Sequence, residues 1–398
     1  MVHKKITLRN VRPWGAEAAD ITFSDGIITE VTRAGGVSEP GDLDGAGLLA
    51  VPGFVNAHAH IDKSWWGKPW VSYTYSENPT VEGWIANERA ERGNYDIPNT
   101  ASATAVLREF LRHGTTATRT HIDVDLGIGL KGLESVQAAV AELDGAIHVE
   151  TVAFPQDGVL RRPGVMRLLE EAAQAGVHSI GGLDPGTIDG DVEGQLEGLF
   201  QIAVDHGVGV DLHLHDFGSL GAYEYRQVIR RTIDAGLQGK VSISHGFALG
   251  ALQPSVQEEI VEGLAEAGIS WTTVAMSGTA PLPWQLMRDH GVPLGLGTDG
   301  IRDLWSPFGD GDLLRVAFAF ARLHGFRHDD KLVMAVEHAT KHGAPFVGRG
   351  EHGLAAGAPA DIVLLDAENV PDVLVRCPQR RVVISGGRVV ARDGEVLL

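Results

Sequence analysis

The chain has 398 residues, of which 43% are hydrophobic and 21% are charged, so it can bury a large core and does not have the composition of a disordered protein. Its formal net charge of −19 disfavours nucleic acid or an anionic membrane as a partner and favours a small neutral or cationic substrate. The single cysteine, Cys377, excludes an intrachain disulfide, and no apolar run approaches the roughly 18 residues of a membrane span, so we expect a cytoplasmic protein.

The two ends of the chain carry the same pattern. Short segments of alternating apolar and polar residues, joined by Gly-containing turns, recur within residues 1–50 and again within residues 352–398. Such segments are typical of antiparallel hairpins. We therefore predict that these two stretches pair into one small β-sandwich domain, and that residues 51–351 form a separate catalytic domain.

The middle of the chain alternates between strand-like and helix-like segments. The apolar strand candidates are residues 48–58, 115–121, 147–154, 177–183, 208–214, 241–245, 269–274 and 292–298. The helix candidates between them include residues 100–113, 164–175, 190–206, 223–235 and 255–267. Eight such units predict an α/β fold of the (β/α)₈ TIM barrel type. An open doubly wound sheet is the alternative, but no Gly-rich phosphate-binding sequence follows the first strand.

A pair of histidines ends the first barrel strand. His58 and His60 are two residues apart, and side chains alternate faces along a strand, so both imidazoles leave on the same side and can bind one cation. The connection that follows, Trp65 to Asn99, is long and aromatic, which is typical of a loop that covers a substrate.

Polar side chains also stand at the ends of most other strands. They are Thr120, His121, Asp123, Gln156, Asp184, His213, His215, Asp216, Ser244, His245, Thr298 and Asp299. An unpaired polar group in a core costs about 1–3 kcal/mol, so packing alone does not account for this set. Barrel enzymes place their chemistry at the carboxyl ends of the strands, and we predict the active site there.

These motifs resemble the amidohydrolase superfamily, and within it the cytosine deaminase branch with one metal. The resemblance covers nearly the whole chain and includes the segments 51–63 and 353–365. The N-isopropylammelide amidohydrolase type is closer still, through the segments 118–125, 213–218 and 299–309.

The resemblance implies a metal site made of His58, His60, His213 and Asp299. Three imidazoles and one carboxylate suit Zn²⁺, with Fe²⁺ as the alternative. Binuclear members of the superfamily bridge their metals with a lysine or glutamate of strand four. Residues 177–184 contain neither, so we expect one divalent metal per chain.

The resemblance also implies the acid and base groups. Asp216 stands three residues after His213, where cytosine deaminases carry a glutamate that shuttles protons and the ammelide type carries aspartate. His245 corresponds to the second acid/base of the family. Asp299 can accept a hydrogen bond from the attacking water as well as bind the metal. We expect His215 to be directed away from His213 and to have a structural role.

Substrate contacts are expected from Lys63, Gln156, Asp184 and Trp305. For Lys63 the alternative is a surface position, and for Trp305 it is packing. His121 and Asp123 are expected to support the floor of the pocket, with substrate contact as the alternative. Gly300 stands where the ammelide type carries asparagine, so one polar contact of those relatives is missing here.

The implied function is that of a metal-dependent hydrolase. It would deaminate or dealkylaminate a planar nitrogen heterocycle, such as a cytosine, isocytosine or amino-s-triazine compound, by attack of a metal hydroxide. The alternatives are hydrolysis of a cyclic or N-acyl amide on the same scaffold, or metal binding without catalysis. The expected partner is a small-molecule heterocycle rather than nucleic acid or a membrane, and self-association as a homo-oligomer stays open.

Overall fold

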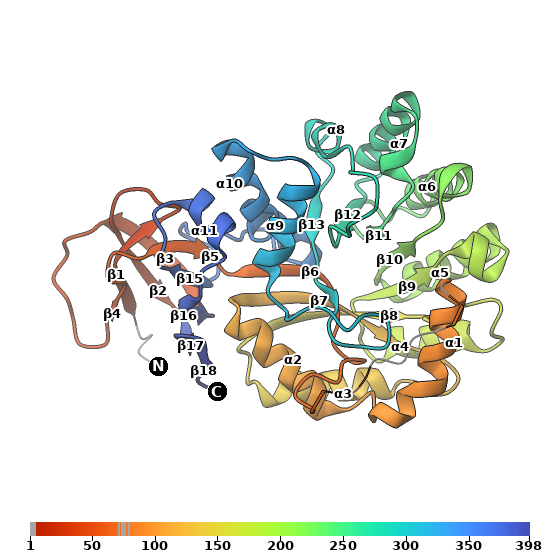
Figure 1. Ribbon diagram of the computed structural model, residues 1–398, viewed down its shortest axis with the longest axis horizontal. Helices are drawn as coiled ribbons and strands as arrows, with labels where there is room; N and C mark the ends of the chain where they lie inside the picture. Colours follow the sequence, from red (N-terminus) through yellow and green to blue (C-terminus); the bar gives the residue numbers. More distant parts are fainter. Residues whose placement is uncertain (1–4, 71, 73–76, 79) are drawn as a thin grey trace.

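Parallel strands curl into a barrel in the computed structural model, which describes residues 5–70, 72, 77–78 and 80–398 (Figure 1). They are β6 (Phe54–His60), β7 (Thr115–Asp123), β8 (His148–Phe154), β9 (Ser179–Leu183), β10 (Gly209–Leu214), β11 (Val241–His245), β12 (Ser270–Thr273), β13 (Leu294–Leu296) and β14 (Asp299–Gly300). From β6 to β13, each strand pairs with the next in chain order. The short strand β14, which follows β13 in the chain, pairs with β6 at the other end of this series and so brings the two ends of the barrel together.

Helices follow the strands and pack on the outside of the barrel (Figure 1). They are α2 (Thr100–Arg112), α3 (Lys131–Glu142), α4 (Val165–Gln174), α5 (Val192–His206), α6 (Gly218–Asp234), α7 (Pro254–Glu266), α8 (Trp284–Asp289), α9 (Leu313–Leu323) and α10 (Asp329–His338). The predicted TIM barrel is therefore confirmed. Among the described residues, none of the helices is both long and apolar enough to cross a membrane.

The predicted first strand, residues 48–58, is divided between two sheets. β5 (Leu49–Pro52) pairs with β1 (Ile6–Pro13) and β15 (Ile362–Leu365), whereas β6 belongs to the barrel. At Gly53 the chain passes so close to β7 that an added Cβ would lie 2.1 Å from the Thr116 hydroxyl. Only glycine fits this crossing, and the apolar run of the sequence hides it.

The second sheet unites the two ends of the chain, at the left of Figure 1. Its other strands are β2 (Ala19–Ser24), β3 (Ile27–Arg33), β4 (Leu43–Asp44), β16 (Arg380–Ser385), β17 (Arg388–Arg392) and β18 (Glu395–Val396), with α11 (Val370–Arg376) between β15 and β16. Its core combines Leu8 and Phe23 from one end with Ile362 and Ile384 from the other. Burial of these apolar side chains joins the ends into one unit, as predicted.

The long connection after β6 contains a helix that we did not predict. Within Trp65 to Asn99, α1 (Val81–Glu91) begins at Thr80, whose hydroxyl accepts a hydrogen bond from the Gly83 N–H at 3.1 Å. Residues 71, 73–76 and 79 of this predicted covering loop lie outside the described residues. Thr80 is a typical helix-starting residue, so the signal was present in the sequence.

Candidate active site

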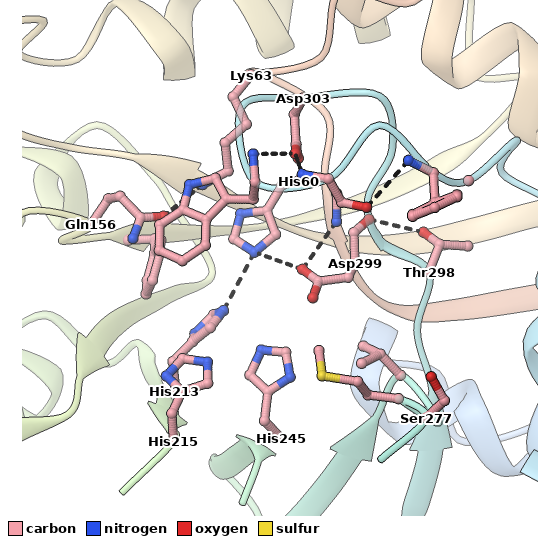
Figure 2. Close-up of a pocket in the computed structure, with 18 residues that line it drawn as sticks. His60, Lys63, Gln156, His213, His215, His245, Ser277, Thr298, Asp299 and Asp303 are labelled. Atoms are coloured by element: carbon pink, nitrogen blue, oxygen red, sulfur yellow. Dashed lines mark hydrogen bonds and ion pairs between the residues drawn. The ribbon is translucent and has the colours of Figure 1, made fainter. Parts of the chain in front are cut away.

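A cavity of about 390 Å³ opens at the carboxyl ends of the barrel strands, a size suited to a small ring compound (Figure 2). Its lining includes His60, Lys63, Phe154, Gln156, His213, His215, His245, Asp299, Gly300, Asp303 and Trp305. His213, His215 and His245 lie on one side of His60, and Lys63 and Asp303 lie on the other.

Four predicted metal ligands converge beside this cavity. The Nε2 atoms of His60 and His213 are 3.3 Å apart. The Asp299 Oδ1 atom lies 3.5 Å from His58 Nε2 and 3.4 Å from His60 Nε2. The three histidines are buried, and together with His121 they each bring one ligand atom within 4.8 Å of the others. His58, His245 and Asp299 form a second group of the same kind.

The donor atoms of this group suit a cation. Burial holds the pKa values of His60 and His213 well below the ordinary range, so both imidazoles are neutral and each keeps a lone pair. His58 Nε2 is buried and has no hydrogen-bond partner among the described residues. Neutral nitrogens and one carboxylate facing a shared point match the ligand set of Zn²⁺ or Fe²⁺.

A hydrogen-bond chain fixes the tautomer of His58. Ser244 donates its hydroxyl proton to Asp211 Oδ1 at 2.7 Å, because a carboxylate can only accept. The Ser244 oxygen must then accept from His58 Nδ1, 3.0 Å away. His58 therefore carries its proton on Nδ1 and leaves the Nε2 lone pair free for a metal.

His121 packs against the predicted metal ligands on the side away from the cavity. Its Nε2 atom lies 3.2 Å from Asp211 Oδ1, and its ring centre lies 4.2 Å from that of His58. Burial lowers the pKa of His121 to about 4, so this imidazole is neutral too. It does not line the cavity, which agrees with the supporting role we expected rather than a substrate contact.

His215 lines the cavity, although we expected it to point away from His213. The two residues are two positions apart, so the alternation of a strand places them on the same side, as it does His58 and His60. The His215 ring stacks on His245 with centres 4.7 Å apart, and its Nδ1 lies 2.8 Å from Asp184 Oδ2. Asp184 is thus placed behind His215 and not in the cavity lining, whereas we expected it at the substrate.

Three residues at the ends of strands have positive φ angles, which residues other than glycine rarely adopt. The φ angles of Asp184, His245 and Asp299 are 32°, 67° and 61°. Each such residue costs of order 1–3 kcal/mol, and the surrounding structure must supply that energy. Strained residues of this kind gather at functional sites, which agrees with the placing of His245 and Asp299 in the cavity wall.

Asp216, the predicted proton shuttle, lies outside the cavity lining. Its Oδ1 accepts a hydrogen bond from the Thr187 hydroxyl, and its Oδ2 accepts one from the Thr187 N–H at 3.1 Å. Glu224 of α6 lies next to it. Burial, with the charge of Asp216, raises the pKa of Glu224 to about 9, so Glu224 keeps its proton at neutral pH.

The opposite wall is built around Lys63. Its Nζ donates to Gln156 Oε1 at 2.6 Å and to Asp123 Oδ1 at 3.1 Å, and lies 3.7 Å from Glu88 Oε2. Lysine can only donate, so the Gln156 oxygen faces Lys63 and the Gln156 amide N–H groups remain for another acceptor. The structure thus brings Lys63 and Gln156 together in the cavity, and the alternative surface position of Lys63 is wrong.

Glu88 of α1 contacts both Lys63 and Trp305, and so links this wall to the loop that carries Trp305. The Trp305 indole N–H donates to Glu88 Oε2, and Lys63 Nζ lies 5.6 Å from the Trp305 ring centre. Sequence reasoning missed Glu88, because its helix, α1, was taken as a loop. Trp305 both packs against this helix and lines the cavity, so the two alternatives for it are compatible.

Comparisons with known proteins agree with this geometry. Residues 99–391 match the Amidohydrolase family. The crystal structure of N-isopropylammelide isopropylaminohydrolase from Burkholderia multivorans is 39% identical, with a TM-score of 0.94 over 99% of this chain and 100% of that one. N-isopropylammelide isopropyl amidohydrolase of Pseudomonas sp. (strain ADP) is 29% identical, over 88% of each chain.

A more distant relative shares the fold over its whole length. The crystal structure of 5-methylcytosine deaminase from Klebsiella pneumoniae, liganded with 5-fluorocytosine, is 25% identical, with a TM-score of 0.81 over 99% of this chain and 98% of that one. These matches confirm the resemblance on which the site was predicted. The chain belongs to the amidohydrolase family and is an enzyme of that family.

Proposed function

We propose that this enzyme hydrolyses the bond between an exocyclic amine and a ring carbon of a planar nitrogen heterocycle of the cytosine, isocytosine or amino-s-triazine kind. The oxygen of water forms a bond to that carbon, the carbon–nitrogen bond breaks, and the amine or alkylamine leaves with a proton. The observation that supports this most is the mutual approach of His58, His60, His213 and Asp299 beside a polar wall in one ring-sized cavity. Relatives named for N-isopropylammelide and 5-methylcytosine add to that support.

His58, His60, His213 and Asp299 are the residues that would hold the metal, one divalent ion per chain. Zn²⁺ is the first candidate and Fe²⁺ the second, since imidazole and carboxylate suit both and availability decides between them. When bound, such an ion supplies an acidified water as the nucleophile near neutral pH.

Lys63 and Gln156 would bind the oxygen of the substrate ring. Lys63 donates to Gln156 and Asp123, and Glu88 Oε2 lies 3.7 Å away, too far for a hydrogen bond, so one of its three N–H groups remains for a ligand. The Gln156 amide N–H groups are directed away from Lys63. A ring carbonyl held by these donors becomes more electron-poor at its neighbouring carbon, which favours attack. Trp305 would cover the face of the ring.

His245 would move the protons. It lines the cavity, and its ring approaches both His58 and Asp299, so it can take a proton from the attacking water and give one to the departing amine. Asp216 lies behind this wall on Thr187. We therefore assign Asp216 to holding the chain after β9 in place and not to direct contact with the substrate.

The expected partner and location follow from the same features. A net charge of −19 does not favour a nucleic acid, and the cavity is of the size of a small molecule. The one cysteine, Cys377, is a free thiol, which suits the reducing cytoplasm that we propose as the location.

The test is an amine-release screen with purified protein of known metal content. Cytosine, isocytosine, ammelide and N-isopropylammelide are compared with a cyclic imide, and ring opening is followed by ultraviolet absorbance. We expect amine release from at least one amino ring, without ring opening. Hydrolysis of the imide alone would replace this proposal with amide hydrolysis on the same scaffold.

A further inference from the structure

Asp303 carries an unused acceptor in the wall of the cavity. The residue is only 1% exposed, yet it belongs to the cavity lining, beside Lys63 in Figure 2. Its Oδ1 accepts hydrogen bonds from the backbone N–H groups of Trp305 and Ser306, both at 2.9 Å. Its Oδ2 is buried and has no hydrogen-bond partner within the described part of the chain.

The Oδ2 atom of Asp303 occupies the space above Gly300. A Cβ added to Gly300 would lie 1.7 Å from this oxygen, which no pair of unbonded atoms tolerates. Gly300 is not in the left-handed backbone region, so its conformation does not require glycine. Glycine is required here because the Asp303 carboxylate leaves no room for a side chain. The carboxylate of Asp303 thus lies over the residue next to Asp299, one of the expected metal ligands.

The surroundings of Asp303 give its second oxygen no hydrogen bond within the described part of the chain. The charge of Lys63 attracts Asp303, but the ammonium group donates to Asp123 and Gln156 and forms an ion pair with Glu88. Burial raises the pKa of Asp303 to about 7, and the charge of Lys63 and the two backbone hydrogen bonds to Oδ1 offset this effect only in part. An N–H group brought by a ligand would supply the missing hydrogen bond.

We propose that Asp303 is a specificity-determining residue whose Oδ2 accepts a hydrogen bond from an N–H of the substrate, next to the carbonyl oxygen that Lys63 and Gln156 bind. The site then selects rings in which a C=O and an N–H are neighbours. Asp303 is placed to read this edge, because it lines the same cavity as Lys63 and Gln156 and lies on the same side of His60 as Lys63 (Figure 2). This inference rests on the proposed function and adds the pattern by which the ring is recognised.

The direct test replaces one acceptor with a donor of the same shape. In Asp303→Asn, the amide oxygen can still accept from Trp305 and Ser306, while an NH₂ group stands where Oδ2 was. We expect kcat/KM for N-isopropylammelide to fall about 10- to 100-fold, mainly through KM. Asp310→Asn, in the same loop but outside this cavity, is the control and should match wild type.

A second probe separates recognition from simple damage. Wild type should prefer N-isopropylammelide over its ring N-methylated analogue, and Asp303→Asn should lose most of that preference at unchanged metal content and thermal stability. An unchanged KM and preference in Asp303→Asn would overturn the inference while the proposed function stands. If wild type released amine from none of the amino rings, the proposed function would fail and this inference with it.

The close approach of Asp303 to Gly300 can be tested separately. Gly300→Ala as a single substitution should raise KM, because the new Cβ displaces the Asp303 carboxylate. The same substitution in an Asp303→Ala background should raise KM little further. Equal losses in the two backgrounds would contradict the placing of Asp303 over Gly300.

Discussion

The two walls of the cavity are built in opposite ways. The histidine wall comes from the ends of barrel strands, and its imidazoles at positions 60, 213 and 245 are held neutral by burial. The Lys63 wall combines loop residues with Glu88 of α1 and Asp123 at the end of β7, and it holds these buried carboxylates around one ammonium group. Neutral nitrogens leave lone pairs for a cation, whereas the charged wall binds and orients polar groups of a ring. Changes in the two walls should therefore have separable effects.

The largest effect is expected in the histidine wall. His60→Ala removes a ligand that faces both His213 and Asp299, so the protein should lose its metal and at least about 10³-fold in kcat. Metal content by mass spectrometry and amine release check this. His290→Ala, an exposed histidine, is the control. Full metal content in His60→Ala would contradict the ligand assignment.

Breaking the other wall should leave the metal in place. Lys63→Met removes the ammonium group from Asp123, Glu88 and Gln156, and uncompensated buried carboxylates cost about 3–5 kcal/mol. We expect a lower free energy of unfolding and a higher KM, with unchanged metal content. Lys68→Met, a half-exposed lysine of the same connection, should change neither quantity much. Metal loss in Lys63→Met would show that the two walls are not separable.

A smaller effect should follow from the hydrogen bond behind His58. Ser244→Ala removes the acceptor of the His58 Nδ1 proton and leaves the ligand less firmly oriented. Metal affinity should fall about 10- to 100-fold, as measured by competition with a chelator. Ser242→Ala, on the same strand but bonded to Arg119, serves for comparison. Equal metal affinities of Ser244→Ala and wild type would show that the hydrogen bond between Ser244 and His58 does not contribute to metal binding.

Glu224 lies outside both walls and should affect only the pH dependence of stability. Its pKa is raised from 4.5 to about 9, so the folded protein keeps a proton that the unfolded chain releases. This group stabilises the fold at low pH, and its contribution falls by up to about 1.4 kcal/mol per pH unit as pH rises through that window. Glu224→Gln should flatten the pH dependence of the unfolding free energy between pH 6 and pH 8. The same slope in both proteins would mean that Glu224 is ionised in the fold.

The histidine wall could be predicted from the sequence because its residues stand at the ends of predicted barrel strands. Barrel strands end at one rim, so polar residues after apolar runs meet there whatever the connecting helices do. His58, His60, His213 and Asp299 are such residues. The prediction for His215 was wrong because residues two apart along a strand share a face, as His58 and His60 do, so alternation places His215 on the same side as His213.

The Lys63 wall could be predicted only in part. Lys63 and Gln156 follow strands, but Glu88 reaches them from a helix inside a long connection, and nothing in its spacing indicates where that helix packs. Asp216 was placed by its spacing from His213, yet its orientation depends on contacts with Thr187 across a loop. The split at Gly53 depends on the approach of Thr116, which is remote in sequence.

Metal removal and return test the central claim most directly. Amine release from the most active ring of the screen is measured before chelation, after it, and after Zn²⁺ or Fe²⁺ is added back, with metal counted at each stage. The account predicts about one metal ion per chain, loss of activity with the metal, and recovery with its return. Full activity in metal-free protein would contradict it.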